Sequence, residues 1–179
     1  IQDQSDALVT NLKPNVLELI DEACGGVVEM RTTEGKALKS DLEQQLSTIR
    51  EHLKFIKQRA PEIVADYECR LKQRMESLLE EIGKSVAAED VIKEVAVFSE
   101  KTDIAEEIKR LDGHLTQFDE LSSRLDGEPV GRTLDFLAQE MLREANTIAS
   151  KCLDGETSRR IVEIKGAIDR IKEQVQNAE

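Results

Sequence analysis

The sequence predicts an all-α protein, in which a long antiparallel helical hairpin is followed by a bundle of three to four helices. Aromatic residues make up only 3% of the 179 residues and Trp is absent, whereas a strand-rich fold needs more aromatic and β-branched residues. The 9 Gly and 3 Pro residues are too few for the many turns of a sheet protein. Apolar residues recur at steps of three and four over most of the chain, which is the spacing of one face of a helix.

The N-terminal part of the chain has a helical pattern that strengthens along the sequence. Residues 1–13 show no clear period and are left unassigned. A helix is expected from Pro14, since proline suits a first helical turn, although the glycine pair at 25–26 weakens it. Residues 38–56 then carry a narrow apolar seam with coiled-coil-like spacing, which predicts a helix that packs along one face.

Pro61 is expected to separate this helix from the next one. Proline pushes the residue before it out of helical geometry, so the first helix should end near Ala60 and a second should cover about residues 62–82. A connection this short makes the two helices antiparallel neighbours, and Gly83 would cap the second. We therefore expect a long hairpin in this part of the chain.

Residues 86–179 are expected to form a helical domain of their own, after the hairpin domain of residues 1–85. A break is expected at residues 99–103, where Asp103 and Glu106 have the spacing that caps and restarts a helix. The stretches "LDGEPVGR" and "LDGETS" are turn sequences. The apolar seams that predict the helices of this domain lie at residues 88–98, 104–121, 134–148 and 161–175.

The chain is acidic, with a net charge of −12, and the charge is spread evenly along it. Residues 1–90 hold 12 basic and 18 acidic groups, and residues 91–179 hold 13 and 19. Neither half is therefore a basic module. Because binding to phosphates usually needs a basic face, charge alone disfavours nucleic-acid binding by this chain.

Cysteine content and the start of the chain limit the class further. Cys24, Cys69 and Cys152 are far apart and odd in number, which argues against a zinc knuckle or a disulfide framework and favours reduced thiols in the cytosol. No apolar run approaches the ~20 residues of a membrane span, and the first residues are too polar for a signal peptide. The chain does not begin with Met, so we expect it to be part of a longer protein.

Two polar stripes follow helical spacing on consecutive predicted helices, and antiparallel packing is expected to bring them face to face. Arg offers a planar donor fork for phosphate or carboxylate, amides both donate and accept, and His114 can transfer protons near neutral pH. The alternative is structural, since such stripes also join neighbouring helices through ion pairs. The first stripe is Asp103, Glu107, Arg110, His114 and Gln117, and the second is Arg132, Asp135, Gln139, Arg143, Asn146 and Ser150.

Acidic side chains on the same two helices are candidates for metal binding. Glu140 and Glu144 lie one helical turn apart, and Glu106 or Glu107 could contribute from the preceding helix. Oxygen ligands of this kind suit Mg²⁺ or Mn²⁺. Acidic pairs are also common on solvated helix faces, which is the alternative for these residues. His52 has no partner in the sequence and is expected to be structural.

Four segments are too specific for generic helical sequence, and together they resemble the YicC family of bacterial proteins. The resemblance implies the C-terminal helical domain of that family at residues 86–179, preceded by the end of its N-terminal domain. Two departures from the family pattern are Gly113, where Ser is usual, and Ala149, where Gly is usual. The segments are "EMRTTEGKALKSDL" (29–42), "KTDIAEEIKRLDGHLTQF" (101–118), "EPVGRTLDFLAQEMLREANTIASK" (128–151) and "IKEQVQNAE" (171–179).

The resemblance implies a cytoplasmic, metal-dependent endoribonuclease or RNA-decay factor that assembles as a hexameric ring, with RNA rather than DNA as its ligand. Its recurring residues coincide with most members of the two stripes. On this basis we expect His114, Glu107 and Glu140 to act in catalysis, and Glu140 and Glu144 to hold Mn²⁺ or Mg²⁺. The residues expected to bind RNA are Arg110, Gln117, Arg132, Asp135, Gln139, Arg143, Asn146 and Lys151.

Two other functions stay open. The first is a non-catalytic adaptor that delivers RNA to a separate nuclease. The second is a structural helical homo-oligomer whose stripes are ion pairs between subunits. The acidic net charge requires either a basic segment elsewhere in the longer protein or an arrangement that gathers the few Arg residues on one surface.

Overall fold

The computed structural model describes residues 2–80, 88–124, 129–152 and 154–177. All elements in these ranges are α-helices, which confirms the predicted all-α class with a helical bundle in the second part of the chain. In place of the antiparallel hairpin predicted within residues 1–85, residues 2–80 form one long continuous helix. None of these helices is long and apolar enough to cross a membrane. The helices are α1 (Gln2–Glu80), α2 (Ala88–Thr102), α3 (Ala105–Ser122), α4 (Gly131–Lys151) and α5 (Gly155–Asn177).

The residues divide into two compact units, Ile1–Asp41 and Leu42–Glu179. The first unit is helical from Gln2 onward, including the residues before Pro14 that had no clear sequence period. Its large apolar side chains between Leu12 and Met30 are exposed. The predicted domain boundary between residues 85 and 86, and the predicted cap at Gly83, lie outside the described residues.

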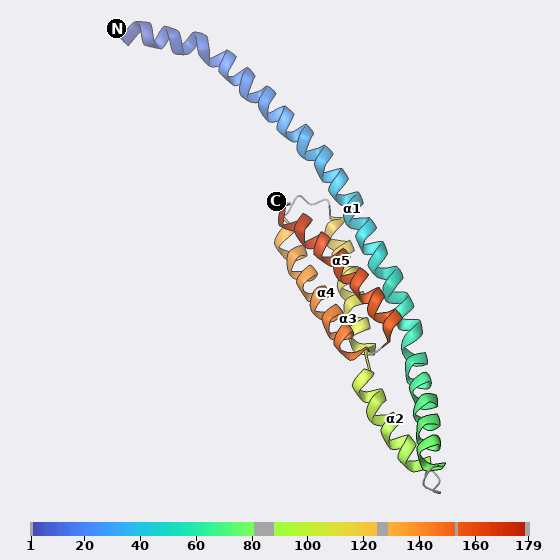
Figure 1. Ribbon diagram of the computed structural model, residues 1–179. Coiled ribbons are helices and arrows are strands. Elements are labelled where there is room, and N and C mark those ends of the chain that lie inside the picture. Colours follow the sequence, from blue (N-terminus) through green and yellow to red (C-terminus); the bar gives the residue numbers. More distant parts are fainter. Residues whose placement is uncertain (1, 81–87, 125–128, 153, 178–179) are drawn as a thin grey trace. The chain divides into compact units, whose positions relative to one another are not determined.

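The second unit is a bundle in which α4 packs against both α3 and α5, and the part of α1 after Asp41 lies alongside them (Figure 1). The predicted apolar seams form its core, because the 3-4 spacing places one side chain per turn on the buried face. The largest side chains that are fully buried come from all four helices: Leu46, Ile49, Ile56, Leu111, Leu115, Phe118, Met141, Ile148, Ile161, Ile164, Ile168 and Ile171.

The helix break predicted at Ala60 and Pro61 is wrong, because α1 continues through both residues to Glu80. Pro61 removes one backbone hydrogen bond, yet Ile56 and Ile63, on either side of it, are both buried against the bundle. Burial of this face outweighs the missing bond. Helix α2 packs against the C-terminal part of α1, where the rings of Tyr67 and Phe98 stack with centroids 3.6 Å apart.

One carboxylate links α1 to the start of α5. Asp154 Oδ2 accepts hydrogen bonds from the backbone N–H of Thr157 at 2.9 Å and from its hydroxyl at 2.8 Å, and Arg59 lies 3.6 Å from Asp154 Oδ1. The Thr157 N–H lowers the pKa of Asp154 most strongly, against the effect of burial. Arg59 also pairs with Glu62 at 2.8 Å and with Asp66 at 2.9 Å, so it connects the residues before Pro61 to those after it.

Replacement of Pro61 by Ala tests whether α1 is continuous. We expect Pro61→Ala to increase the free energy of unfolding by about 1–3 kcal/mol, since it restores the N–H that a helix interior requires. Urea unfolding followed by far-UV circular dichroism measures the change. Glu68→Ala, an exposed substitution on α1, is the control and should change stability by less than about 0.5 kcal/mol. Lower stability of Pro61→Ala would show that the chain turns at this residue.

Candidate metal centre

The seam between α3 and α4 brings acidic, basic and imidazole side chains together. The two helices run antiparallel, so contacts pair early residues of α3 with late residues of α4. From α3 these side chains come at helical spacing, and from α4 they lie one or two turns apart. The residues that meet are Glu107, Arg110 and His114 of α3 with Glu140, Glu144 and Lys151 of α4.

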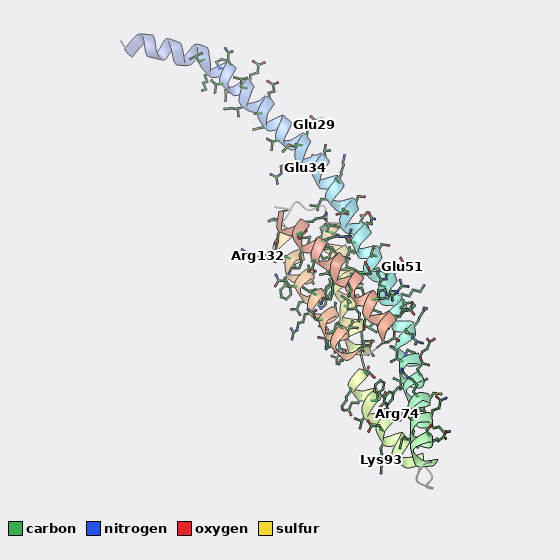
Figure 2. All side chains as sticks on the ribbon, viewed as in Figure 1. Glu29, Glu34, Glu51, Arg74, Lys93 and Arg132 are labelled. Atoms are coloured by element: carbon green, nitrogen blue, oxygen red, sulfur yellow. The ribbon has the colours of Figure 1, made fainter. Side chains whose placement is uncertain are left out.

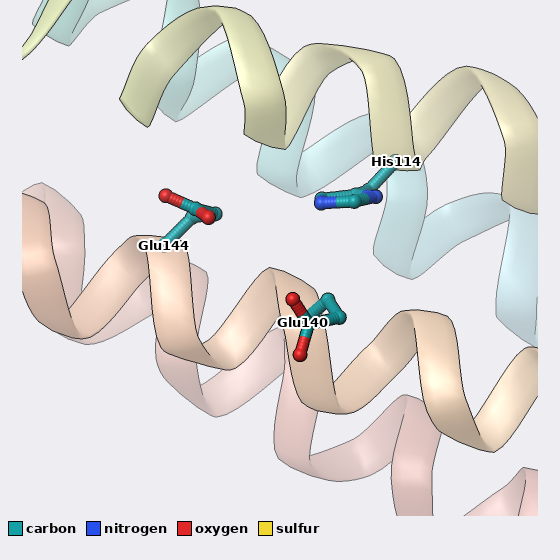
Figure 3. Close-up of side chains that lie close together, drawn as sticks. All are labelled: His114, Glu140 and Glu144. Atoms are coloured by element: carbon teal, nitrogen blue, oxygen red, sulfur yellow. The ribbon is translucent and has the colours of Figure 1, made fainter. Parts of the chain in front are cut away.

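His114, Glu140 and Glu144 form the part of this seam that could hold a metal ion. One ligand atom of each lies within 4.8 Å of the others, and Figure 3 shows the three side chains pointing toward one another across the two helices. Ligands of one octahedral ion lie about 3 Å apart in cis and about 4 Å apart in trans, so small side-chain rotations would complete the site. An imidazole with two carboxylates suits Mn²⁺ better than Mg²⁺, which prefers oxygen ligands alone.

Glu144 is the best-positioned ligand of the three. Its side chain is only 7% exposed, and its Oε1 accepts a hydrogen bond from Arg110 Nε at 2.9 Å. Its Oε2 is buried and has no hydrogen-bond partner among the described residues. A buried carboxylate oxygen without a partner is costly, and a bound cation would satisfy it. The residues present therefore fit a divalent cation. Arg110 would orient the Glu144 carboxylate through its hydrogen bond to Oε1.

Glu107 lies in the same seam but is held by cations instead. Its Oε1 accepts from Lys151 Nζ at 2.9 Å and lies 3.4 Å from Arg110, while only 5% of its side chain is exposed. Burial alone would raise the pKa of Glu107, but the hydrogen bond and charge of Lys151 and the charge of Arg110 outweigh it and hold this pKa below its usual range. Glu107 is therefore an ionised structural partner near neutral pH and a poor proton donor.

The stripe predicted on α4 does not face α3, contrary to the expected face-to-face arrangement. It lies next to the metal centre and lines an open groove of about 410 Å³, to which α5 contributes Lys172. The α4 residues that contact α3 lie about 60–100° further round the helix, because each residue turns a helix by about 100°. The lining residues from the stripe are Gln139, Arg143, Asn146 and Ser150.

Arg143 connects this groove to the metal centre. Its guanidinium lies 3.7 Å from Glu140 Oε2, and 74% of its side chain is exposed. Glu140 itself is partly exposed beside this arginine. Such an arrangement can place a phosphate between an arginine and a cation.

The remaining predicted site residues are not gathered at the centre. Asp135 accepts a hydrogen bond from Gln139 at 2.7 Å and one from Gln176 of α5 at 3.5 Å, which indicates a role in holding helices. Arg132 is exposed in the first turn of α4, two turns from Glu140 (Figure 2). Gln117 is exposed on α3.

Comparison with known proteins identifies the family. Residues 56–179 match the family model described as "Endoribonuclease YicC-like, C-terminal". This range contains His114, Glu140 and Glu144. The chain belongs to this family. The resemblance to the YicC family found in the sequence is thereby confirmed.

Two curated relatives carry the name "Probable endoribonuclease YicC". The protein from Clostridioides difficile (strain 630) is 35% identical over 163 residues, which cover 90% of this chain and 54% of the relative. The protein from Haemophilus influenzae (strain ATCC 51907 / DSM 11121 / KW20 / Rd) is 30% identical over 168 residues, with 94% and 56% covered. The chain thus spans about half the length of the curated relatives it matches.

Loss of the Glu107 carboxylate should destabilise the seam in a pH-dependent way. The folded-state pKa is below the unfolded value, so the ionised carboxylate stabilises the fold above about pH 4.5, and this stabilisation is lost as pH falls through the folded pKa. We expect Glu107→Gln to lower the free energy of unfolding by about 2 kcal/mol at neutral pH. The difference from wild type should shrink on acidification.

Urea unfolding of both chains over a pH series measures this difference. Glu106→Gln is the control, because Glu106 also pairs with Arg110 but its side chain is 79% exposed, so it should cost less than about 0.5 kcal/mol. A deficit of Glu107→Gln that stayed constant with pH would contradict the assigned ion pairs.

Proposed function

We propose that this chain supplies the metal centre of an endoribonuclease, which cleaves structured RNA with a divalent cation bound to His114, Glu140 and Glu144. The observation that carries the proposal is the buried, unpartnered oxygen of Glu144 beside His114 and Glu140. The names of the two curated relatives support the choice of RNA cleavage as the reaction. We expect Mn²⁺ to fit better than Mg²⁺, because one ligand is an imidazole.

The surrounding residues divide into those that would touch RNA and those that position others. A cation bound here would stabilise charge on a phosphate oxygen and lower the pKa of a bound water. Arg143, exposed beside Glu140, would bind a phosphate of the RNA next to the cleaved bond. Arg110 holds Glu144 in orientation, and Lys151 holds Glu107, so both act through other side chains.

This arrangement changes the expected role of His114. A ring nitrogen that binds a cation has no lone pair left for a proton, so His114 acts here as a ligand. The groove on α4 would hold RNA through the exposed amides of Gln139 and Asn146 and the ammonium of the partly buried Lys172. Asp135, which bonds to amides of α4 and α5, is assigned to helix packing.

Metal binding can be tested without any activity. We expect Mn²⁺ at about 100 times its Kd to raise the free energy of unfolding of the wild-type chain by about 2.7 kcal/mol, because it binds only the folded site. Glu140→Gln should lose most of this increase. Glu163→Gln, which removes an exposed carboxylate of α5, should keep it. The same increase in Glu140→Gln as in wild type would place the cation elsewhere.

RNA cleavage is the direct test. A purified protein carrying this chain should cleave a labelled RNA hairpin with Mn²⁺ and should stop when a chelator is added. His114→Ala should abolish cleavage, whereas His52→Ala, at the other His of the chain, should retain it. Cleavage that persisted in chelator would refute the metal-dependent reaction. Tight RNA binding by a protein that does not cleave would instead support the adaptor function.

Phosphate binding by Arg143 predicts a specific salt dependence. We expect Arg143→Ala to weaken RNA binding and to reduce the slope of log affinity against log salt by about 0.7–0.9, the value of one phosphate contact. Arg170→Ala, on the side of α5 away from Lys172, should leave the slope unchanged. Fluorescence anisotropy with labelled RNA hairpin measures both. An unchanged slope in Arg143→Ala would remove Arg143 from the RNA-binding surface.

The hexameric ring and the cytoplasmic location implied by the family resemblance remain part of the proposal. The exposed apolar side chains of α1 in the first unit support association of subunits, since such side chains are usually covered in an assembly. Light scattering of the full-length protein measures the number of subunits directly.

A further inference from the structure

A furrow between α1 and α3 has the opposite charge from the chain as a whole. Arg50, Lys54 and Lys57 lie on one side of it, at helical spacing along α1, and Lys109 lies on the α3 side. Asp112 is the only acidic residue among those that line it. The furrow has a volume of about 560 Å³, in a chain with 25 basic and 37 acidic residues.

The three lysines have no charge partner in the parts of the chain that the structure describes. Lys54, Lys57 and Lys109 are all exposed and take part in none of its ion pairs or hydrogen bonds. Only Arg50 is engaged, with the Asp119 carboxylate and with the Leu115 carbonyl at 3.4 Å. The three lysines outnumber the one lining carboxylate and repel one another, so this arrangement favours a bound polyanion.

The floor of the furrow is apolar. Leu53 of α1 and Ile108 of α3 form it and are both buried. Ala105 lines the α3 side with a small side chain. A row of lysines suits a nucleic-acid strand, whose closely spaced phosphates can pair with it. The furrow shares helix α3 with the candidate metal centre, which favours RNA over an acidic peptide as its occupant.

The furrow and the metal centre lie on either side of the exposed face of α3. Lys109 is followed directly by Arg110, which holds Glu144, and the two side chains point about 100° apart around the helix. The predicted RNA-binding residue Gln117 is exposed on the face between them, together with Glu120 and with Glu106, whose carboxylate pairs with Arg110. A helix is about 10 Å across, so a single strand can pass over α3 from the furrow to the metal centre.

We propose that this furrow binds the phosphate backbone of a single-stranded RNA segment on the side of the metal centre opposite the α4 groove. The inference rests on the proposed function, and it adds a second binding surface to the same RNA. The strand would run from the furrow over α3 to the metal centre and on to Arg143, so that phosphates on both sides of the cleaved bond are held.

A triple variant tests the furrow. In Lys54→Gln/Lys57→Gln/Lys109→Gln, the slope of log affinity against log salt for labelled oligouridylate should fall by about 2, because each phosphate contact with single-stranded RNA contributes about 0.7. Affinity should fall at least about tenfold at moderate salt. The triple change to Arg, which keeps the charges, should retain both. Binding is measured by fluorescence anisotropy in chelator, so that the RNA stays intact.

The control removes the same number of charges elsewhere. Lys36→Gln/Lys72→Gln/Lys93→Gln changes three exposed lysines outside the furrow and should leave the salt slope at its wild-type value. An equal fall in both triple variants would show that net charge alone governs binding, and would overturn the inference.

Failure of the furrow and failure of the proposed function give different results. If the wild-type chain binds neither oligouridylate nor the RNA hairpin, the proposed function fails and the furrow with it. If the wild type binds and the furrow variant keeps the wild-type salt slope, only the furrow is refuted. Binding of labelled polyglutamate that needs the three lysines, with RNA binding unchanged, would refute RNA in favour of an acidic protein partner.

Discussion

The structure of the candidate site depends on two buried carboxylates, Glu107 and Glu144, in one seam between antiparallel helices. A buried charge must be matched by opposite charge, so the seam also contains Arg110 and Lys151. These partners set the register of α3 against α4. The same register brings His114 beside Glu140 and leaves one oxygen each of Glu107 and Glu144 without a hydrogen-bond partner among the described residues. The possible metal centre is therefore a consequence of how the charges in the seam are balanced.

Most of the fold could be predicted from sequence because helix packing in this chain follows the 3-4 apolar spacing. The seams around Leu46, Leu111 and Ile164 all became core. The prediction failed at Pro61, where local backbone preference was outweighed by the burial of residues on both sides. Local preferences are small compared with the burial of several apolar side chains, and only the tertiary structure shows which of them is overridden.

The site could be predicted in part. Spacing identified Glu140 and Glu144 as a pair, and it placed Glu107, Arg110 and His114 on one face of α3. It could not give the rotation of α4 against α3, so the stripe with Arg143 was placed on the wrong side of its helix. Lys172 lies on α5, and its place beside the α4 residues of the groove becomes visible only in the structure. Arg50, Lys54 and Lys57 follow helical spacing in the sequence. Because the net charge of the chain is acidic, this local cluster of basic residues was not predicted to be a binding surface.

Asp154 has a consequence for how local opening spreads through the bundle. It bonds the first turn of α5 and also faces Arg59, whose other partners lie beyond Pro61 on α1. If the start of α5 frays, Asp154 no longer holds its position and Arg59 loses one of its carboxylates. The missing backbone hydrogen bond at Pro61 and the first turn of α5 therefore belong to one cooperative unit. Amide protons in both places should exchange with solvent together, as a single opening unit, although almost one hundred residues separate them in sequence.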